Sequence, residues 1–168
     1  IEGEAAGFAE YKSVKGALRN NLPEGLKLVA DSVQPPVAAP YKWSAKRSGD
    51  QLVLSGNVPD EAMREQVFAL AKKTYPKRAI VDRLEPAQGA PQGLAGVVRA
   101  AIEQLAALKS GEISLTDLQL SMTGEAPDEA TAGTVVGTMR TVAKGFKVSD
   151  AVTFPKPTPP IAAPFVIR

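Results

Sequence analysis

The chain has 168 residues and a net charge of +2; 44% of its residues are hydrophobic, 23% are charged and 5% are aromatic. These proportions are typical of one globular domain or two small ones, and the small excess of positive charge gives no strong attraction to nucleic acid or anionic lipid. The absence of cysteine and histidine excludes disulfides, thiolate nucleophiles, and the commonest general base and metal ligand. Runs of about 18 apolar residues, which a membrane-spanning helix needs, are missing from the sequence.

The first predicted unit covers residues 1–37, and its opening phrase recurs along the chain. IEGEA is followed by a helix pattern at 8–21, a strand pattern at 26–33 and a proline pair. LSGNV and MTGEA repeat the phrase, and the three glycines are Gly3, Gly56 and Gly124. Such self-similarity predicts tandem copies of one small module. We interpret residues 1–37 as the C-terminal part of a preceding unit in a chain excised from a longer one.

The second predicted unit, 38–90, has the order β-β-α-β. Alternating residues on both sides of a Gly-Asp pair predict a hairpin, and the glycine of LSGNV favours a strand-to-helix bend rather than a ligand contact. Residues 60–75 carry apolar side chains at helical spacing, with acidic residues early and lysines late. AIVDRL then predicts a short strand.

The third predicted unit, 91–160, adds a leading helix at 93–109 and has the order α-β-β-α-β. A hairpin with its turn near Asp117 is expected, then a helix at 128–143 and a strand at 146–154. Whether the leading helix serves one unit or both is left open. KPTPP then predicts a stiff spacer, and 161–168 the first strand of a following unit, because AAPYKW returns there as AAPFVI.

Four groups of residues are candidates for chemistry. The acidic pairs Asp60-Glu61 and Asp128-Glu129 suit helix capping better than acid–base catalysis. Tyr41 and Trp43 suit packing on the hairpin face better than ligand binding. The densest basic cluster is the best candidate for a phosphate-facing patch, against the alternative of a solvated helix end; it consists of Lys72, Lys73, Lys77 and Arg78.

These features resemble the BON domain, named for bacterial osmotically inducible and nodulation proteins. The matching residues are Leu54, Gly56, Val58, Ala62, Val67, Ala71, Val81, Asp82 and Leu84, and the third unit matches through Met122, Gly124, Ala126 and residues 148–152. The tandem arrangement with proline-rich joins is similar to the region ahead of the peptidoglycan-binding domain in some proteobacterial OmpA-family proteins. Departures are the YPKRAI stretch at 75–80, where the family often has Gly-Val, and the missing leading helix of the second unit.

The resemblance implies an α+β fold, an α/β sandwich of tandem modules, in which mixed three-stranded sheets carry helices on one face. It also implies a non-catalytic, periplasmic module associated with the outer membrane, which contacts phospholipid or other envelope components and needs no cofactor or metal. A self-associating assembly module, similar to KH-like or secretin-ring domains, is the alternative and would form a homo-oligomer. We expect no nucleic-acid partner, because no basic GxxG loop is present.

Overall fold

The computed structural model describes residues 2–4, 7–20 and 32–156, in which four helices and eight strands form. The helices are α1 Phe8–Asn20, α2 Glu61–Thr74, α3 Leu94–Ala107 and α4 Glu129–Val142. The strands are β1 Glu2–Glu4, β2 Ser32–Gln34, β3 Lys42–Ser48, β4 Gln51–Val58, β5 Ala79–Pro86, β6 Ser110–Thr116, β7 Gln119–Glu125 and β8 Lys147–Thr153. The expected α+β class and both unit orders are therefore confirmed. The expected spacer and the strand at 161–168, and most of that at 26–33, lie outside the described residues.

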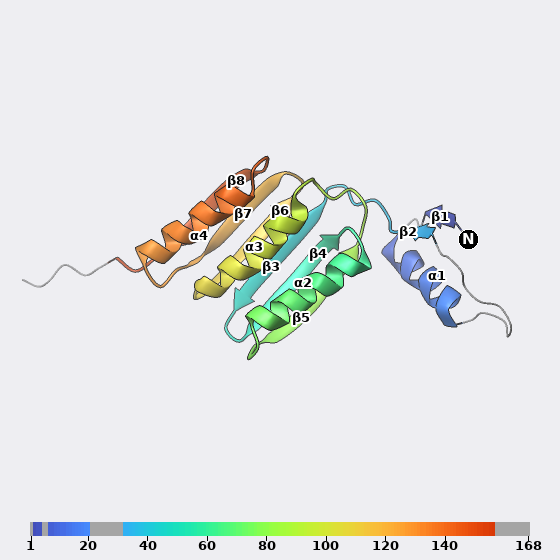
Figure 1. Ribbon diagram of the computed structural model, residues 1–168, viewed down its shortest axis with the longest axis horizontal. Helices are drawn as coiled ribbons and strands as arrows, with labels where there is room; N and C mark the ends of the chain where they lie inside the picture. The colour runs from blue at the N-terminus through green and yellow to red at the C-terminus, as the bar shows by residue number, and fades with distance from the viewer. Residues whose placement is uncertain (1, 5–6, 21–31, 157–168) are drawn as a thin grey trace, which may run out of the picture.

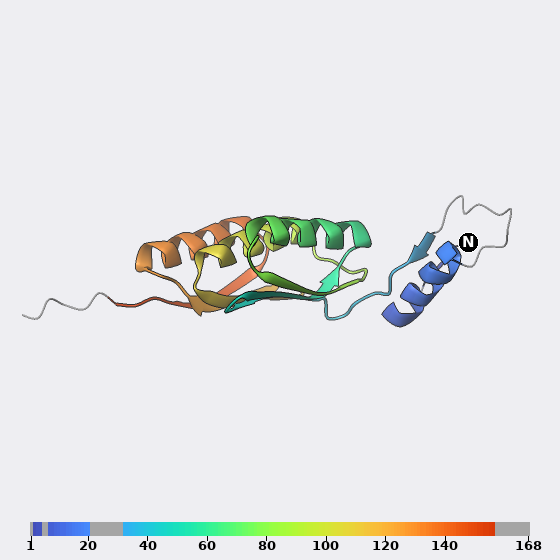
Figure 2. The same cartoon turned by 90° about the horizontal axis from the view of Figure 1, so that it is seen from below.

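Strands from both complete units join in one mixed sheet with the order β5-β4-β3-β6-β7-β8. The expected separate three-stranded sheets are thus wrong in this respect, because β3 pairs with β6 from Lys42 to Arg47, almost its whole length. Within each unit the hairpin is antiparallel and the last strand pairs in parallel with the second. Helices α2, α3 and α4 cover one face only (Figures 1 and 2). On the other face of β3 lie Lys42, Ser44 and Lys46, which alternate with the buried Trp43 and Ala45.

The two units are related by a local two-fold axis through the centre of this sheet. Adding 68 to the residue numbers of β3 and α2 gives those of β6 and α4. The same offset relates the N-cap of α2, Asp60, to that of α4, Asp128. Ala45 pairs with Ile113, and 45 plus 68 is 113, so equivalent residues of the two units face each other there. A pairing of this kind is self-complementary, like the contact in a symmetric dimer. The spacing of 68 residues between Gly56 and Gly124 is this repeat.

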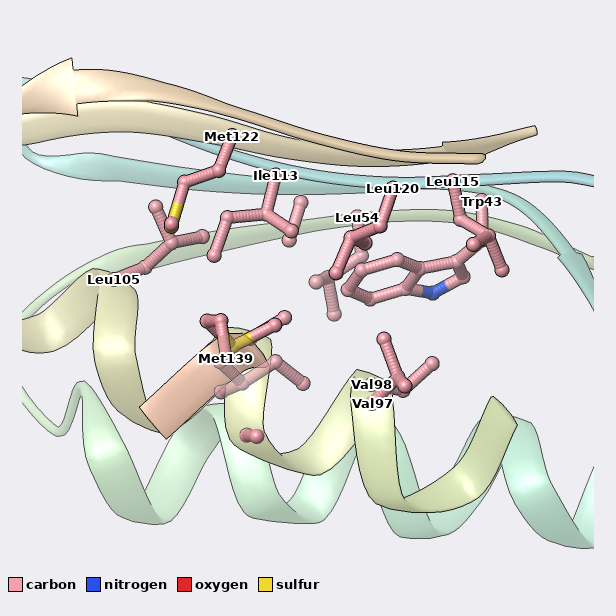
Figure 3. Packing of buried hydrophobic residues seen from close by; sticks show 14 of the residues in the cluster. Trp43, Leu54, Val97, Val98, Leu105, Ile113, Leu115, Leu120, Met122 and Met139 are labelled. Carbon is pink, nitrogen blue, oxygen red and sulfur yellow. The ribbon is translucent and has the colours of Figure 1, made fainter. Parts of the chain in front are cut away.

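Helix α3 lies over the sheet centre, between α2 and α4, and packs on both units (Figure 1). Its apolar residues cover a broad stripe, and seven of them are buried: Leu94, Val97, Val98, Ala100, Ala101, Ile102 and Leu105. Side chains from β3, β4, β6 and β7, among them Trp43 and Leu54, point from the sheet toward this helix (Figure 3). Because α3 occupies the position of the local axis, a second leading helix would collide with it. This explains why the second unit has none.

The repeat glycines permit close strand approach rather than a strand-to-helix bend. Gly56 lies inside β4 opposite Trp43, has a φ of +100°, and a Cβ there would lie 2.3 Å from the Lys42 carbonyl oxygen. Gly124 lies opposite Gly111, and a Cβ there would lie 2.6 Å from the Ser110 carbonyl oxygen. The structure therefore corrects the bend interpretation: the glycines stand where a neighbouring backbone leaves no room for a side chain.

The first unit contains β1 and β2 paired in parallel, with α1 between them in sequence. Gly3 lies in β1 and pairs with Val33, as Gly56 pairs with Leu84 and Gly124 with Val152. In all three cases the helix begins five residues after the glycine. The segment after β2 is tied to the main body through Gln88, whose side-chain nitrogen donates to the Pro35 carbonyl and whose backbone NH donates to that of Pro36.

Candidate interaction site

The four basic residues predicted from the sequence lie at the C-terminal end of α2 and in the loop that follows. Lys72 and Lys73 are in the last helical turn, where positive charge complements the helix dipole. The Lys72 ammonium lies 4.5 Å from the centre of the Phe68 ring. Lys73 and Lys77 are exposed, and neither forms an ion pair with any residue of the described ranges. Of the four predicted basic residues, these two are the most available to an anionic partner.

Arg78 has a structural role. Its Nη1 donates to the carbonyl of Gly49 in the β3–β4 turn and lies 4.0 Å from the Asp50 carboxylate. Its side chain is 27% exposed, compared with 102% for Asp50. Arg78 therefore holds a hairpin turn against the start of β5, and replacing it would disturb the fold as well as the charge.

A further cation at this end was missed by the sequence analysis. The Arg47 guanidinium donates to the carbonyls of Leu105 and Ala106, both at 2.9 Å, and to that of Leu108, at the C-terminus of α3. Burial, followed by the nearby charge of Arg78, lowers the pKa of Arg47. The sequence around Arg47 indicates only that this residue lies in a strand. It contains no sign that Arg47 caps the C-terminus of a helix about 60 residues later.

Tyr75 links the end of α2 to the C-terminal half of α3. Its hydroxyl donates a 2.8 Å hydrogen bond to the Ile102 carbonyl, and the side chain is buried. Burial raises the pKa of Tyr75 to about 12, against the opposing effect of the Arg47 and Arg78 charges. The two helices are thus fastened at the end that carries the basic residues.

Between α2 and α3 the outer surface of the helical layer is hollowed into a groove of about 420 Å³. Met63 and Leu70 of α2 contribute apolar surface above the buried Val67 and Val98. Gln66 and Arg99 contribute polar edges. The size falls in the range of small-molecule sites. In the sequence, Met63, Val67 and Leu70 belong to the stripe that predicted a core-facing helix. The partial exposure of Met63 and Leu70 in a groove follows from the spacing between α2 and α3, which no local pattern encodes.

The remaining candidates have structural roles. Asp60 and Asp128 are N-caps whose carboxylates accept from the backbone NH groups of Met63 and Thr131, both at 2.7 Å. The hydrogen bond from the Thr131 backbone lowers the pKa of Asp128. Tyr41 and Trp43 are each 1% exposed in the core. Burial raises the pKa of Tyr41 above its ordinary value, and the neighbouring Asp60 charge acts in the same direction.

Residues 44–87 match the BON-like domain family. The match runs from β3 through β5 and thus covers the second unit, with α2 at its centre. A search of curated proteins found no match to the chain. None of the described helices is long and apolar enough to cross a membrane. The described residues also include no cluster of three or more acidic side chains that could hold a metal ion.

Proposed function

We propose that this chain is a non-catalytic interaction module of the bacterial cell envelope, periplasmic and associated with the outer membrane as part of an OmpA-family protein, and that its BON-like domain contacts anionic phospholipid. The BON-like match of residues 44–87 carries this proposal. BON domains are generally regarded as phospholipid-binding envelope modules. The match covers the unit that holds the basic end of α2.

The contact site is the end of α2, with Lys73 and Lys77 as its principal cations and Lys72 beside them. Lysines close to an anionic membrane surface each contribute about 1 kcal/mol of attraction, which salt screens. Two or three such residues give weak binding that depends on ionic strength. Such weak lipid binding suits a module in a protein that is also held at the cell envelope by other domains.

Co-sedimentation with vesicles tests the proposal. The wild-type protein should pellet with phosphatidylglycerol-containing vesicles at low salt and remain in solution with phosphatidylcholine alone. A triple variant, Lys72→Glu, Lys73→Glu and Lys77→Glu, should lose pelleting. Arg78 is left intact because it braces the Gly49 turn. The matched control reverses three other exposed cations, Lys42→Glu, Lys144→Glu and Lys147→Glu, in β3, after α4 and in β8. Equal pelleting of the triple variant and the control would remove the α2 end from the proposal.

Self-association is the second candidate, and the junction of β3 with β6 favours it. The two units already join through one pair of strand edges. The outer edges of β5 and β8 pair with no other strand in the described part of the chain. Unpaired edges of this length are templates for further pairing. Sedimentation velocity without lipid would support this candidate by showing concentration-dependent oligomers, and a monomer over the micromolar range would remove it.

A further inference from the structure

We propose that the groove between α2 and α3 binds a single acyl chain, with the anionic headgroup of the same molecule held by Lys73. This inference rests on the proposed function and specifies it: the ligand enters the helical layer instead of only touching its surface. An amphiphile with one apolar chain and one negative charge is the chemical class that fits the groove.

The floor of the groove supplies the apolar part of the site. Val67 and Val98 are fully or almost fully buried, while Met63 and Leu70 are half-buried at its sides. Hydrocarbon lying over Met63, Leu70 and Ala95, which retain exposed apolar surface, would displace water from them favourably. On the α3 side the groove is open, because Ala95 and Gly96 have no long side chain that would fill it.

Helical geometry places one lysine in line with the groove and its neighbour away from it. Gln66 lines the groove, and Lys73 follows it at i+7, two turns along the same side of α2. Seven residues of helix span about 10 Å. Lys72 lies on a different side of the helix, over the ring of Phe68. Lys73 can therefore reach a phosphate at the end of a bound chain, and Lys72 is directed elsewhere.

The other unit shows that the fold does not require this surface. Adding 68 to Met63, Gln66, Leu70 and Lys73 gives Thr131, Thr134, Thr138 and Thr141. Thr134 and Thr141 donate to carbonyls of their own helix, those of Ala130 and Gly137. The same helix side is thus polar and uncharged in α4, and apolar with a cation at its end in α2. Only the α2 side has the complementarity that an anionic amphiphile needs.

Dodecyl phosphate below its critical micelle concentration tests the site directly, with butyl phosphate and inorganic phosphate as probes that lack a long chain. Binding is measured by calorimetry and by amide chemical shifts of α2 and α3. We expect binding of dodecyl phosphate alone, with shifts at Met63, Leu70 and Ala95. Equal affinity for all three probes, or shifts confined to the loop at 75–78, would overturn the groove proposal.

Two matched pairs of variants sharpen the test. Ala95→Trp fills the groove from an exposed position, whereas Ala69→Trp adds the same side chain to an exposed position of α2 outside it. The first should weaken dodecyl phosphate binding at least about tenfold and the second should not. Lys73→Glu should weaken it about tenfold and Lys72→Glu less than about twofold. Circular dichroism confirms that each variant is folded.

The outcomes separate this inference from the proposed function. If the vesicles pellet the wild type and not the triple lysine variant, while Ala95→Trp pellets and binds dodecyl phosphate like Ala69→Trp, the surface contact stands and the groove is rejected. If no protein pellets but dodecyl phosphate binding is lost in Ala95→Trp, weakened in Lys73→Glu and kept in Ala69→Trp and Lys72→Glu, the groove stands as an amphiphile site and the membrane function is rejected.

Discussion

The two complete units have the same order and spacing of elements from first to last strand, but different helix surfaces. A constant offset of 68 residues relates β3, β4, α2 and β5 to β6, β7, α4 and β8, respectively. Both helices have 14 residues. On the side that faces α3, α2 carries long apolar residues and a lysine, whereas α4 carries threonines. The local two-fold symmetry therefore extends to the order and pairing of the strands, but not to the side chains on the helix surfaces. The unit that matches the BON-like family is the one with the apolar groove.

A second difference concerns the space opposite each repeat glycine. In the first of the two units, Trp43 stands opposite Gly56. In the other, the equivalent residue is Gly111, and Leu108 fills the space, with its Cδ1 within about 3 Å of where a Cβ of Gly124 would lie. An aromatic side chain across from a strand glycine is a known stabilising arrangement. Different side chains thus complete the same packing position in the two units.

The largest expected effect comes from replacing these glycines. Gly56→Ala should destabilise the protein by about 3 kcal/mol, because it combines a positive φ with a backbone clash. Gly124→Ala meets backbone at 2.6 Å without a positive φ and should cost less. Urea unfolding measures both. Gly137→Ala, on the exposed side of α4 with nothing within 4 Å, is the control and should be neutral or stabilising by up to about 1 kcal/mol. Equal losses at Gly56 and Gly124 would show that the positive φ adds no strain.

The second expected effect concerns the junction of each helix with α3. Tyr75 ends α2 and bonds to α3, whereas its equivalent at the end of α4 is Ala143. Tyr75→Phe should cost about 1 kcal/mol at neutral pH through loss of this hydrogen bond.

The same tyrosine predicts a loss of stability in alkali. Its folded-state pKa of about 12 lies above the ordinary value of 10.0, so the folded protein holds the proton more tightly. This contribution is complete below pH 10 and is lost as the pH rises toward 12. Unfolding free energies measured between pH 9 and 12 should fall less steeply in Tyr75→Phe than in the wild type. Parallel curves would contradict the raised pKa.

A smaller difference is expected at two equivalent aspartates. Asp82 in β5 accepts from Arg64 Nε at 3.1 Å and from the Leu84 backbone at 3.0 Å, and is 19% exposed. Asp150 in β8 is 24% exposed and pairs with Arg140, which is 61% exposed, whereas Arg64 is 31% exposed. Asp82→Asn should therefore cost about 1 kcal/mol more than Asp150→Asn, because exposed ion pairs contribute little. Thermal unfolding of both variants at neutral pH measures the difference, and equal losses would contradict it.

The sequence predicts the elements well because their signals are local. Asp60, the apolar stripe and Pro76 place α2 within a residue or two, and Gly49-Asp50 places the first hairpin turn. The joining of six strands was not predictable in this way. It depends on the pairing of Ala45 with Ile113, two ordinary strand residues 68 positions apart. The basic residues were visible as a cluster. The groove beside them was not, because Met63 and Leu70 have the same spacing as core residues.

The smallest difference is expected at the helix N-caps, where the two units agree in detail. Asp60 and Asp128 have φ,ψ of −156°,173° and −157°,169°, and each accepts at 2.7 Å from the NH three residues on. Asp60→Ala and Asp128→Ala should therefore lower the urea midpoint equally, and Asn at either position should restore most of it. Because its hydrogen bond lowers the pKa of Asp128, the stabilisation is present above the ordinary carboxylate pKa and is lost as the pH falls through the lowered value. The cost of Asp128→Ala should accordingly shrink in acid. Unequal midpoints at neutral pH would mean that the two units also differ at the start of the helix. The threonines of α4 would then not be the only difference that could explain why α2 alone borders an apolar groove.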